Sequence, residues 1–445
     1  MPASDRGSER RRRRLFSLAL VCVVVAGVEA LGWIGLRLLP DARMRLAAEE
    51  GAAAADGGGE ELSGFRSVHP FLGYVLDPRA SEHEAWGRQH PLPLTEYGFV
   101  GDGPLVQRRA PGRVIVGITG GSVAFHFSLR AAEELTTALK ESPAYREQEI
   151  AVVRFALPGY KQPQQLMALQ YLLALGAEFD VVINLDGFNE VALYPVENAP
   201  RHVFLAYPRA WPELTAQTQD ASGTLVRAKA VLYGRLAARW RQALDWEPLA
   251  WSRAVAFLRE AGARALAGLE RRATLEVVSR RDGELGYSAT GPLRRYPTDD
   301  EMYRELAALW ARSSLQMERV CRSNGARYFH FLQPNQYAAP GKPMDADERA
   351  VAIDPSMPYA GSASAGYPYL QRAGKALAEA NVRFTDLTEL FRATREGVYA
   401  DACCHLNERG NRLVGHAIAR EIVEAGDGVE EAQRIQRMGS AASGS

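Results

Sequence analysis

The sequence is poor in cysteine and has no net charge, and both absences exclude a class of protein. The four cysteines among 445 residues, Cys22, Cys321, Cys403 and Cys404, are too few for a disulfide scaffold and form no CxxC pair or zinc pattern. Cys403 and Cys404 are adjacent, so a bond between them would be strained, whereas either could pair with Cys321 in an oxidising compartment. A formal net charge of 0 argues against a nucleic-acid-binding protein.

Signatures of nucleotide and metal sites are also missing. The glycines before Ser122, in Gly117-x-x-Gly120-Gly121-Ser122, include no P-loop lysine and do not make GxGxxG. The eight histidines show no metal-ligand spacing. We therefore expect no cofactor and no metal. With 47% hydrophobic and 24% charged residues, the chain can bury a sizeable core in one large domain or two smaller ones.

The N-terminus carries a membrane-targeting pattern. Residues 1–14 include a basic cluster and precede an apolar run over 15–36, which is about long enough to cross a ~30 Å hydrocarbon core. The arginines before the run predict that the N-terminus is cytoplasmic and that the rest of the chain is exported. Glu29 weakens the anchor because a carboxylate in the span costs free energy, and a signal peptide cut after Ala30 is the alternative. The length of the apolar run favours an anchor.

From residue 113 onward, short apolar runs alternate with helical stretches. The expected strands cover 114–118, 150–155, 181–185, 328–332 and 382–386. The expected helices cover 130–140, 162–175, 370–380 and 408–425. This alternation predicts an α/β fold, a parallel sheet sandwiched by helices, with functional loops at the carboxyl ends of the strands.

Three segments fall outside this alternation. Residues 47–64 include an Ala-, Gly- and Glu-rich stretch typical of a linker, and 427–445 are expected to form a flexible tail. Residues 196–295 are too long for a plain connection and combine tryptophan, arginine and helical spacing. We interpret them as a helical insertion that forms a lid over the site or a hairpin packed away from it; its Arg-Trp-Leu mixture could also lie against a membrane. The main domain then comprises 65–195 and 296–426.

The first predicted strand leads into a candidate nucleophile. It runs into Thr119-Gly120-Gly121-Ser122, after which a helical stretch begins. Glycines permit a sharp turn, so Ser122 would lie at the edge of the sheet and at a helix N-terminus. The free N–H groups and the helix dipole there favour a developing anion. The alternative is an ordinary glycine turn capped by serine.

Three further strand ends carry polar or glycine motifs. Gly159 follows the second strand, and Asn189 follows the third in Gly187-x-Asn189. Near the C-terminus, Asp401 and His405 are separated by three residues. Each motif alone is weak, but the ordered set of serine, glycine, Gly-x-Asn and Asp…His is much less expected by chance.

This set resembles the SGNH (GDSL-like) hydrolase family, over about 100–190 and 325–425. The resemblance implies that Ser122 is the nucleophile, that His405 is the base and that Asp401 orients it. It also implies an oxyanion hole formed by the Ser122 amide, Gly159 and Asn189.

Three positions depart from the family pattern. Gly121 stands where the family usually has Asp before the serine, and Glu190 stands where Asp follows the asparagine. Three residues instead of two separate Asp401 from His405. A turn could absorb the extra residue, Glu408 could serve as the acid, or His405 could act without one.

The resemblance, together with the N-terminal pattern, implies a membrane-anchored serine esterase or acyltransferase in the bacterial periplasm or at the cell surface. Its substrate would be a small-molecule, glycan or lipid ester, with an O-acylated glycan or lipid favoured. The alternative is a catalytically inactive SGNH-fold protein that binds carbohydrate or assists envelope polysaccharide assembly.

Overall fold

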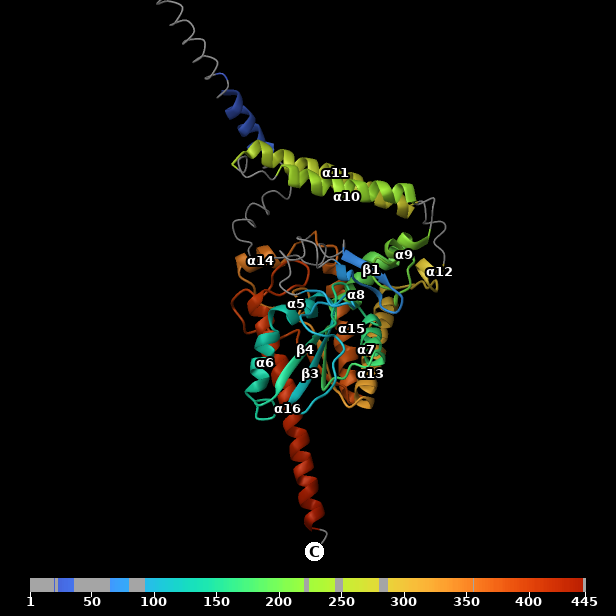
Figure 1. The fold of residues 1–445 in the computed structure, drawn as a ribbon, viewed down its shortest axis with the longest axis vertical. Helices are drawn as coiled ribbons and strands as arrows, with labels where there is room; N and C mark the ends of the chain where they lie inside the picture. The colour runs from blue at the N-terminus through green and yellow to red at the C-terminus, as the bar shows by residue number, and fades with distance from the viewer. Residues whose placement is uncertain are drawn as a thin grey trace, which may run out of the picture. The chain divides into compact units, whose positions relative to one another are not determined.

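The computed structural model describes most of the chain and divides it into two compact units (Figure 1). The described residues are 20, 23–35, 65–79, 93–219, 224–244, 251–279, 287–354 and 356–442. One unit contains Ala55–Thr215 and Gly286–Ser445, and the other contains Met1–Ala54 and Ala216–Leu285. The predicted linker 47–64 and part of the predicted anchor lie outside the described residues. Among the described residues, no helix combines the length and apolar character needed to cross a membrane.

The first unit is built on a five-stranded sheet in which every neighbouring pair is parallel. In sheet order its strands are β4 (Glu149–Arg154), β3 (Arg113–Gly120), β5 (Val181–Asp186), β6 (Arg327–Leu332) and β7 (Arg383–Asp386). Counted along the chain, this is the order 2-1-3-4-5. The central strand β5 is buried along its whole length, as expected of an apolar run covered on both faces. The predicted α/β class and parallel sheet are therefore confirmed, with strand ends within two residues of those expected.

Two groups of helices flank the sheet (Figure 1). The first group comprises α5 (Ser122–Arg130), α6 (Ala132–Lys140) and α16 (Glu408–Ala442). The second comprises α7 (Gln164–Ala174), α8 (Phe188–Leu193), α13 (Asp299–Ser323) and α15 (Ala360–Glu379). A short antiparallel hairpin, β1 (Arg66–His69) and β2 (Gly73–Leu76), precedes the sheet. The connections also contain a π-helical turn η3 (Tyr194–Asn198), a 3-10 turn η4 (Ala199–Arg201) and α14 (Ala346–Ala352).

Several helices differ from the sequence expectation. The single helix expected over 130–140 is preceded by α5, and a break at Ala131, with φ −131°, separates α5 from α6. Helix α13 was not predicted; Thr298 caps it by accepting a hydrogen bond from the Glu301 amide. Helix α15 begins at Ala360 instead of near 370, and α16 continues to Ala442 through residues expected to be a flexible tail.

The second unit contains two long helices that pack as an antiparallel hairpin. They are α10 (Thr224–Ala243) and α11 (Arg253–Ser279). Gly234 lies opposite Glu270, and Trp240 packs on Gly262 and donates a hydrogen bond to the Leu258 carbonyl at 3.0 Å. Two shorter helices flank the hairpin in sequence, α9 (Trp211–Gln219) and α12 (Tyr287–Thr290). The described part of 196–295 is thus largely helical, and its interpretation as a lid or as a hairpin packed away from the site stays a prediction.

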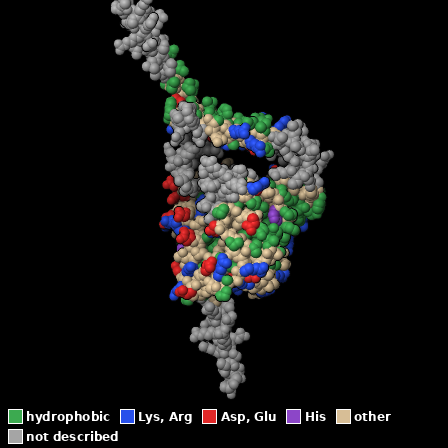
Figure 2. Space-filling model, in the orientation of Figure 1, with side chains coloured by type: hydrophobic (Ala, Val, Ile, Leu, Met, Phe, Trp, Pro, Cys, Tyr) green, Lys and Arg blue, Asp and Glu red, His purple; other side chains and the backbone are tan. Residues whose placement is uncertain are grey.

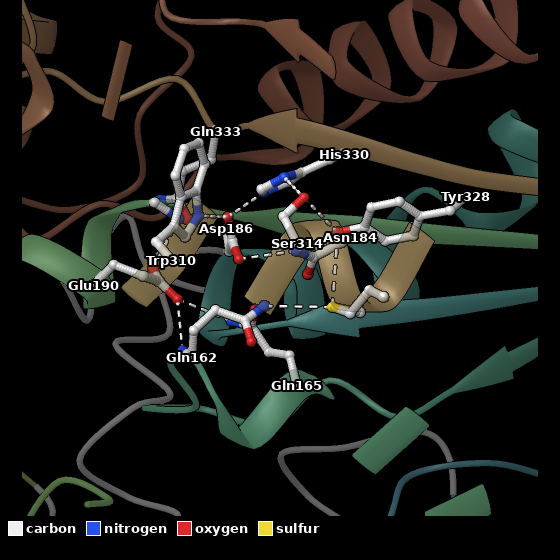
Figure 3. Close-up of polar contacts among 12 residues, drawn as sticks. Gln162, Gln165, Asn184, Asp186, Glu190, Trp310, Ser314, Tyr328, His330 and Gln333 are labelled. Carbon is white, nitrogen blue, oxygen red and sulfur yellow. Dashed lines mark hydrogen bonds and ion pairs between the residues drawn. The ribbon is translucent and has the colours of Figure 1, made fainter. Parts of the chain in front are cut away.

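A buried polar cluster ties α13 to the sheet (Figure 3). The Asp186 carboxyl group accepts hydrogen bonds from Trp310 Nε1 at 2.7 Å and Asn184 Nδ2 at 2.9 Å, and lies 2.8 Å from His330 Nε2. His330 Nδ1 lies 2.7 Å from the hydroxyl of Ser314 on α13. These side chains are at most 1% exposed. Because a buried donor without a partner is costly, the cluster fixes the position of α13.

The cluster predicts a large stability difference between two matched tryptophan variants. Trp310→Phe removes the N–H that the buried Asp186 accepts, and should lower the free energy of unfolding in urea by about 1–3 kcal/mol. Trp211→Phe deletes the same group from a partly exposed tryptophan that donates to the Ser288 carbonyl, and should cost clearly less. Equal losses would show that Asp186 does not stabilise α13.

Candidate active site

The turn after β3 places Ser122 at the carboxyl edge of the sheet. Gly120 has φ +144°, and a Cβ there would lie 2.1 Å from the Leu185 carbonyl oxygen on β5, so only glycine fits. Ser122 is the first residue of α5 and is 7% exposed. The next two strands, β4 and β5, lie on opposite sides of β3, so the strand order reverses at β3. Ligands of open parallel sheets bind at such a point.

The segments after β4 and β5 meet beside Ser122. Asn189, on α8, donates a hydrogen bond from Nδ2 to the Tyr160 carbonyl at 2.8 Å. A Cβ on Gly121 would lie 2.2 Å from the same Nδ2, so Asn189 contacts the residue before Ser122. Gly159, with φ +82°, immediately precedes Tyr160. The structure therefore brings the two predicted oxyanion residues to the loop that carries the predicted nucleophile.

Glu190 holds these segments together (Figure 3). Its Oε1 accepts hydrogen bonds from the Gln162 amide at 3.1 Å and from Gln165 Nε2 at 3.0 Å, and its Oε2 accepts from the Gly187 amide at 2.9 Å. Burial, and secondarily the charge of Asp186, raise the pKa of Glu190 to about 8. The residue that departs from the expected Gly-x-Asn-Asp motif thus joins the β4 and β5 loops.

Asp401 and His405 form a pair despite the extra residue between them. His405 Nδ1 lies 2.5 Å from Asp401 Oδ2. The other oxygen, Oδ1, accepts the backbone N–H groups of Cys403, Cys404 and His405 at 2.9, 3.1 and 3.2 Å. The intervening residues therefore wrap around the carboxylate in a tight turn. Glu408, the alternative acid, is instead 2.9 Å from Arg412 on the exposed start of α16.

The contact between Asp401 and His405 shifts the pKa of both side chains. Burial acts to raise the pKa of Asp401, but the hydrogen bond and charge of His405, with the backbone N–H donors, lower it to about 2. Burial acts to lower the pKa of His405, but the hydrogen bond and charge of Asp401 raise it above its ordinary value. Asp401 is therefore ionised at neutral pH, and its charge favours the imidazolium form of His405.

The His405 ring packs against the helix that carries Ser122. His126 lies one turn after Ser122 on α5, on the same helical face, and its ring centroid is 5.1 Å from that of His405 in an edge-on arrangement. Burial raises the pKa of the Cys404 thiol, and the adjacent Ser122 side chain acts against this rise. His405 Nε2 is buried and has no hydrogen-bond partner among the described residues. The structure thus brings Ser122 close to the predicted base without a direct hydrogen bond between them.

Arg209 is a residue of this site that the sequence analysis missed. Its Cδ lies 2.2 Å from where a Cβ of Gly159 would be, so it packs directly on the predicted oxyanion glycine. The guanidinium is held by Glu197, at 2.5 Å through Nη2 and 3.1 Å through Nε, and Tyr359 donates to the same carboxylate at 2.7 Å. Its positive charge is one of the influences that lower the pKa of the nearby Cys403, after the hydrogen bond from Cys404. Arg209 lies in a segment without periodicity, so no sequence signal could have identified it.

A second Ser–His–Asp series occurs in the interior but cannot act on a substrate. Ser314, His330 and Asp186 are connected as in a triad, yet they are 0%, 0% and 1% exposed. The Trp310 ring lies 4.6 Å from the His330 ring and closes the cluster. Its role is structural, whereas Ser122 begins α5 at the carboxyl edge of the sheet. No group of three or more His, Cys, Asp or Glu side chains in the described parts of the chain is arranged to hold a metal ion.

Comparisons with known proteins identify no relative of this chain. No protein-family model matches the sequence, and no curated protein shows a significant similarity to it. The chemistry attributed to the site therefore has to follow from Ser122, His405, Asp401 and the groups around them.

Proposed function

We propose that this protein is an SGNH-type serine esterase or acyltransferase that acts outside the cytoplasm. The observation that carries the proposal is the Asp401–His405 pair, whose imidazole packs against the helix that begins at Ser122 and has a buried Nε2 with no hydrogen-bond partner among the described residues. The strand order 2-1-3-4-5, which is that of flavodoxin-like three-layer folds, supports the same assignment.

In the proposed reaction, His405 Nε2 takes the proton of Ser122 as the serine oxygen attacks the ester carbonyl. Asp401 keeps the imidazole oriented and stabilises the imidazolium, which matches its low pKa. The Ser122 and Gly159 amides and Asn189 Nδ2 stabilise the oxyanion. His405 then protonates the leaving alcohol, and water or an acceptor alcohol releases the acyl group from Ser122. The hydrogen bond between serine and base would form with substrate in place, because catalytic hydrogen bonds often tighten only then.

The proposed substrate is an O-acylated glycan or a lipid ester. This follows from the proposed location, since the basic cluster and apolar run at the N-terminus predict an anchored, exported chain. No cofactor is required, because serine, histidine and a carboxylate supply nucleophile, base and charge stabilisation.

The second candidate is a protein that has kept this fold without turnover and binds carbohydrate. Its support is that His405 Nε2 has no hydrogen-bond partner among the described residues, so the predicted base is not bonded to Ser122. A fluorophosphonate probe separates the candidates because it labels only an activated serine.

The first prediction concerns the nucleophile. Ser122→Ala should abolish both fluorophosphonate labelling and hydrolysis of p-nitrophenyl acetate by the full-length protein. Ser128→Ala is the matched control: it removes a serine hydroxyl from the same helix, one that donates to the Phe125 carbonyl, and should leave labelling in place. Labelling that persists in Ser122→Ala would place the nucleophile elsewhere.

The second prediction concerns the oxyanion hole. Asn189→Ala should lower kcat by on the order of 10²–10³, equivalent to about 2.7–4 kcal/mol of transition-state stabilisation. Steady-state kinetics with p-nitrophenyl acetate measure this. A rise in KM alone would mean that Asn189 binds substrate without stabilising the oxyanion.

The third prediction concerns the acid. Asp401→Asn should lower kcat by on the order of 10⁴, as expected when a triad carboxylate is neutralised. Turnover needs neutral His405, so wild-type kcat should rise as pH increases through the raised pKa of His405. Removing the Asp401 charge lowers that pKa, so the remaining activity should rise at lower pH than in the wild type. Glu408→Gln is the control and should change neither kcat nor the pH at which activity rises. If Glu408→Gln lowers kcat and Asp401→Asn does not, Glu408 is the acid.

A further inference from the structure

The N-terminal apolar helix is bonded to α11 through Glu29. This helix, described over 23–35, exposes most of its apolar side chains, including Val23 and Leu31, each 69% exposed. The Glu29 carboxylate lies at the N-terminus of α11, where Oε2 accepts the backbone N–H groups of Arg253 at 2.5 Å and Ala254 at 3.3 Å. Oε1 accepts the hydroxyl of Ser252. The carboxylate thus caps α11, which accounts for an acidic residue in an apolar run.

Two glycines let the helices touch. A Cβ on Gly32 would lie 2.4 Å from Ala254 Cα, and a Cβ on Gly35 would lie 2.6 Å from the Phe257 ring. Without a side chain at these two positions, the backbone of the helix can approach α11 closely. The start of α11 is therefore held directly against helix 23–35.

The hairpin that continues from this contact exposes apolar side chains along each helix. On α10, Leu232, Leu236 and Trp240 are spaced by four residues and are 52%, 39% and 40% exposed. On α11, Leu258 and Leu269 are 52% and 41% exposed, and a separation of eleven residues puts them on one face. A water-exposed hairpin gains nothing from these positions, whereas a lipid surface would bury them.

The hairpin is also strongly basic. Residues 229–243 of α10 contain four basic and no acidic residues, and residues 253–273 of α11 contain five basic and two acidic residues, which sums to a net charge of +7. Hydrophobic and basic side chains lie next to one another on the visible face of the hairpin in Figure 2. Apolar side chains interleaved with arginine are typical of helices that lie in the interface of an anionic bilayer.

We propose that the α10–α11 hairpin is an interfacial membrane-binding element. Leu232, Leu236 and Trp240 enter the boundary between headgroups and acyl chains, and Arg235 and Arg239 contact phospholipid phosphates. Helix 23–35 lies in the same bilayer, and its Glu29 cap fixes the hairpin to it. The partner is a phospholipid surface, because the hairpin combines positive charge with apolar exposure and is continuous with an apolar helix. The proposal does not depend on the esterase assignment.

Photo-crosslinking of the full-length protein tests this. The chain is reconstituted into vesicles of phosphatidylethanolamine and phosphatidylglycerol that carry an alkyne-tagged acyl chain, with p-benzoylphenylalanine at position 236. Position 238 is the matched control, because Ala238 is also exposed but lies about 200° away around α10. Position 31 reports on the N-terminal helix. We expect severalfold more lipid adduct at 236 than at 238, and less adduct at 236 when Arg235→Gln and Arg239→Gln are combined.

The remaining outcomes overturn the proposal. Adducts at 31 with equal, low yields at 236 and 238 would place the apolar helix in lipid and the hairpin outside it. A protein–protein adduct at 236 would assign the exposed leucines to a second copy of this chain or to its other unit. Fluorophosphonate labelling of the same samples reports separately on Ser122, so failure of the lipid result is distinguishable from failure of the esterase assignment.

Discussion

Close packing at the carboxyl ends of β3 and β5 is the constraint on which the site depends. Gly120 and Gly187 both have positive φ, and a Cβ on either would collide with a neighbouring strand, 2.1 Å from the Leu185 carbonyl and 2.3 Å from a Leu332 methyl group. Each glycine turns the chain sharply from a buried strand into a helix. The first turn delivers Ser122 and the second delivers Asn189, so the candidate site is a direct result of the tightness of these turns.

Three acidic side chains then join segments that are far apart in sequence. Asp401 collects three backbone donors and His405, Glu190 joins the loops after β4 and β5, and Glu29 caps a helix that begins more than 220 residues later. Each lies where several N–H groups converge, which offsets the cost of removing a polar group from water. An acidic side chain that accepts several N–H groups therefore orients His405, links the loops of the site and holds α11 to the N-terminal helix.

Position in the fold separates two arrangements of the same residue types. Ser314, His330 and Asp186 have the connectivity of a triad and are sealed in the interior, where their hydrogen bonds stabilise the packing of α13. His405 and Asp401 lie on the loop before α16, at the sheet edge, beside Ser122. Connectivity alone therefore does not identify an active site, and the position of the residues in the fold has to be considered with it.

The sequence by itself determined the positions of the strands and the candidate residues at their ends. Runs of β-branched and apolar residues, such as 114–118 and 181–185, encode strands locally, and parallel strands bring their carboxyl ends to one edge. Only the tertiary structure decided that Asp401 rather than Glu408 pairs with His405, that Arg209 packs on Gly159, and that Glu29 caps α11. Such contacts join residues without any shared periodicity, and their free energy comes from burial and donor geometry that exist only once distant segments have packed.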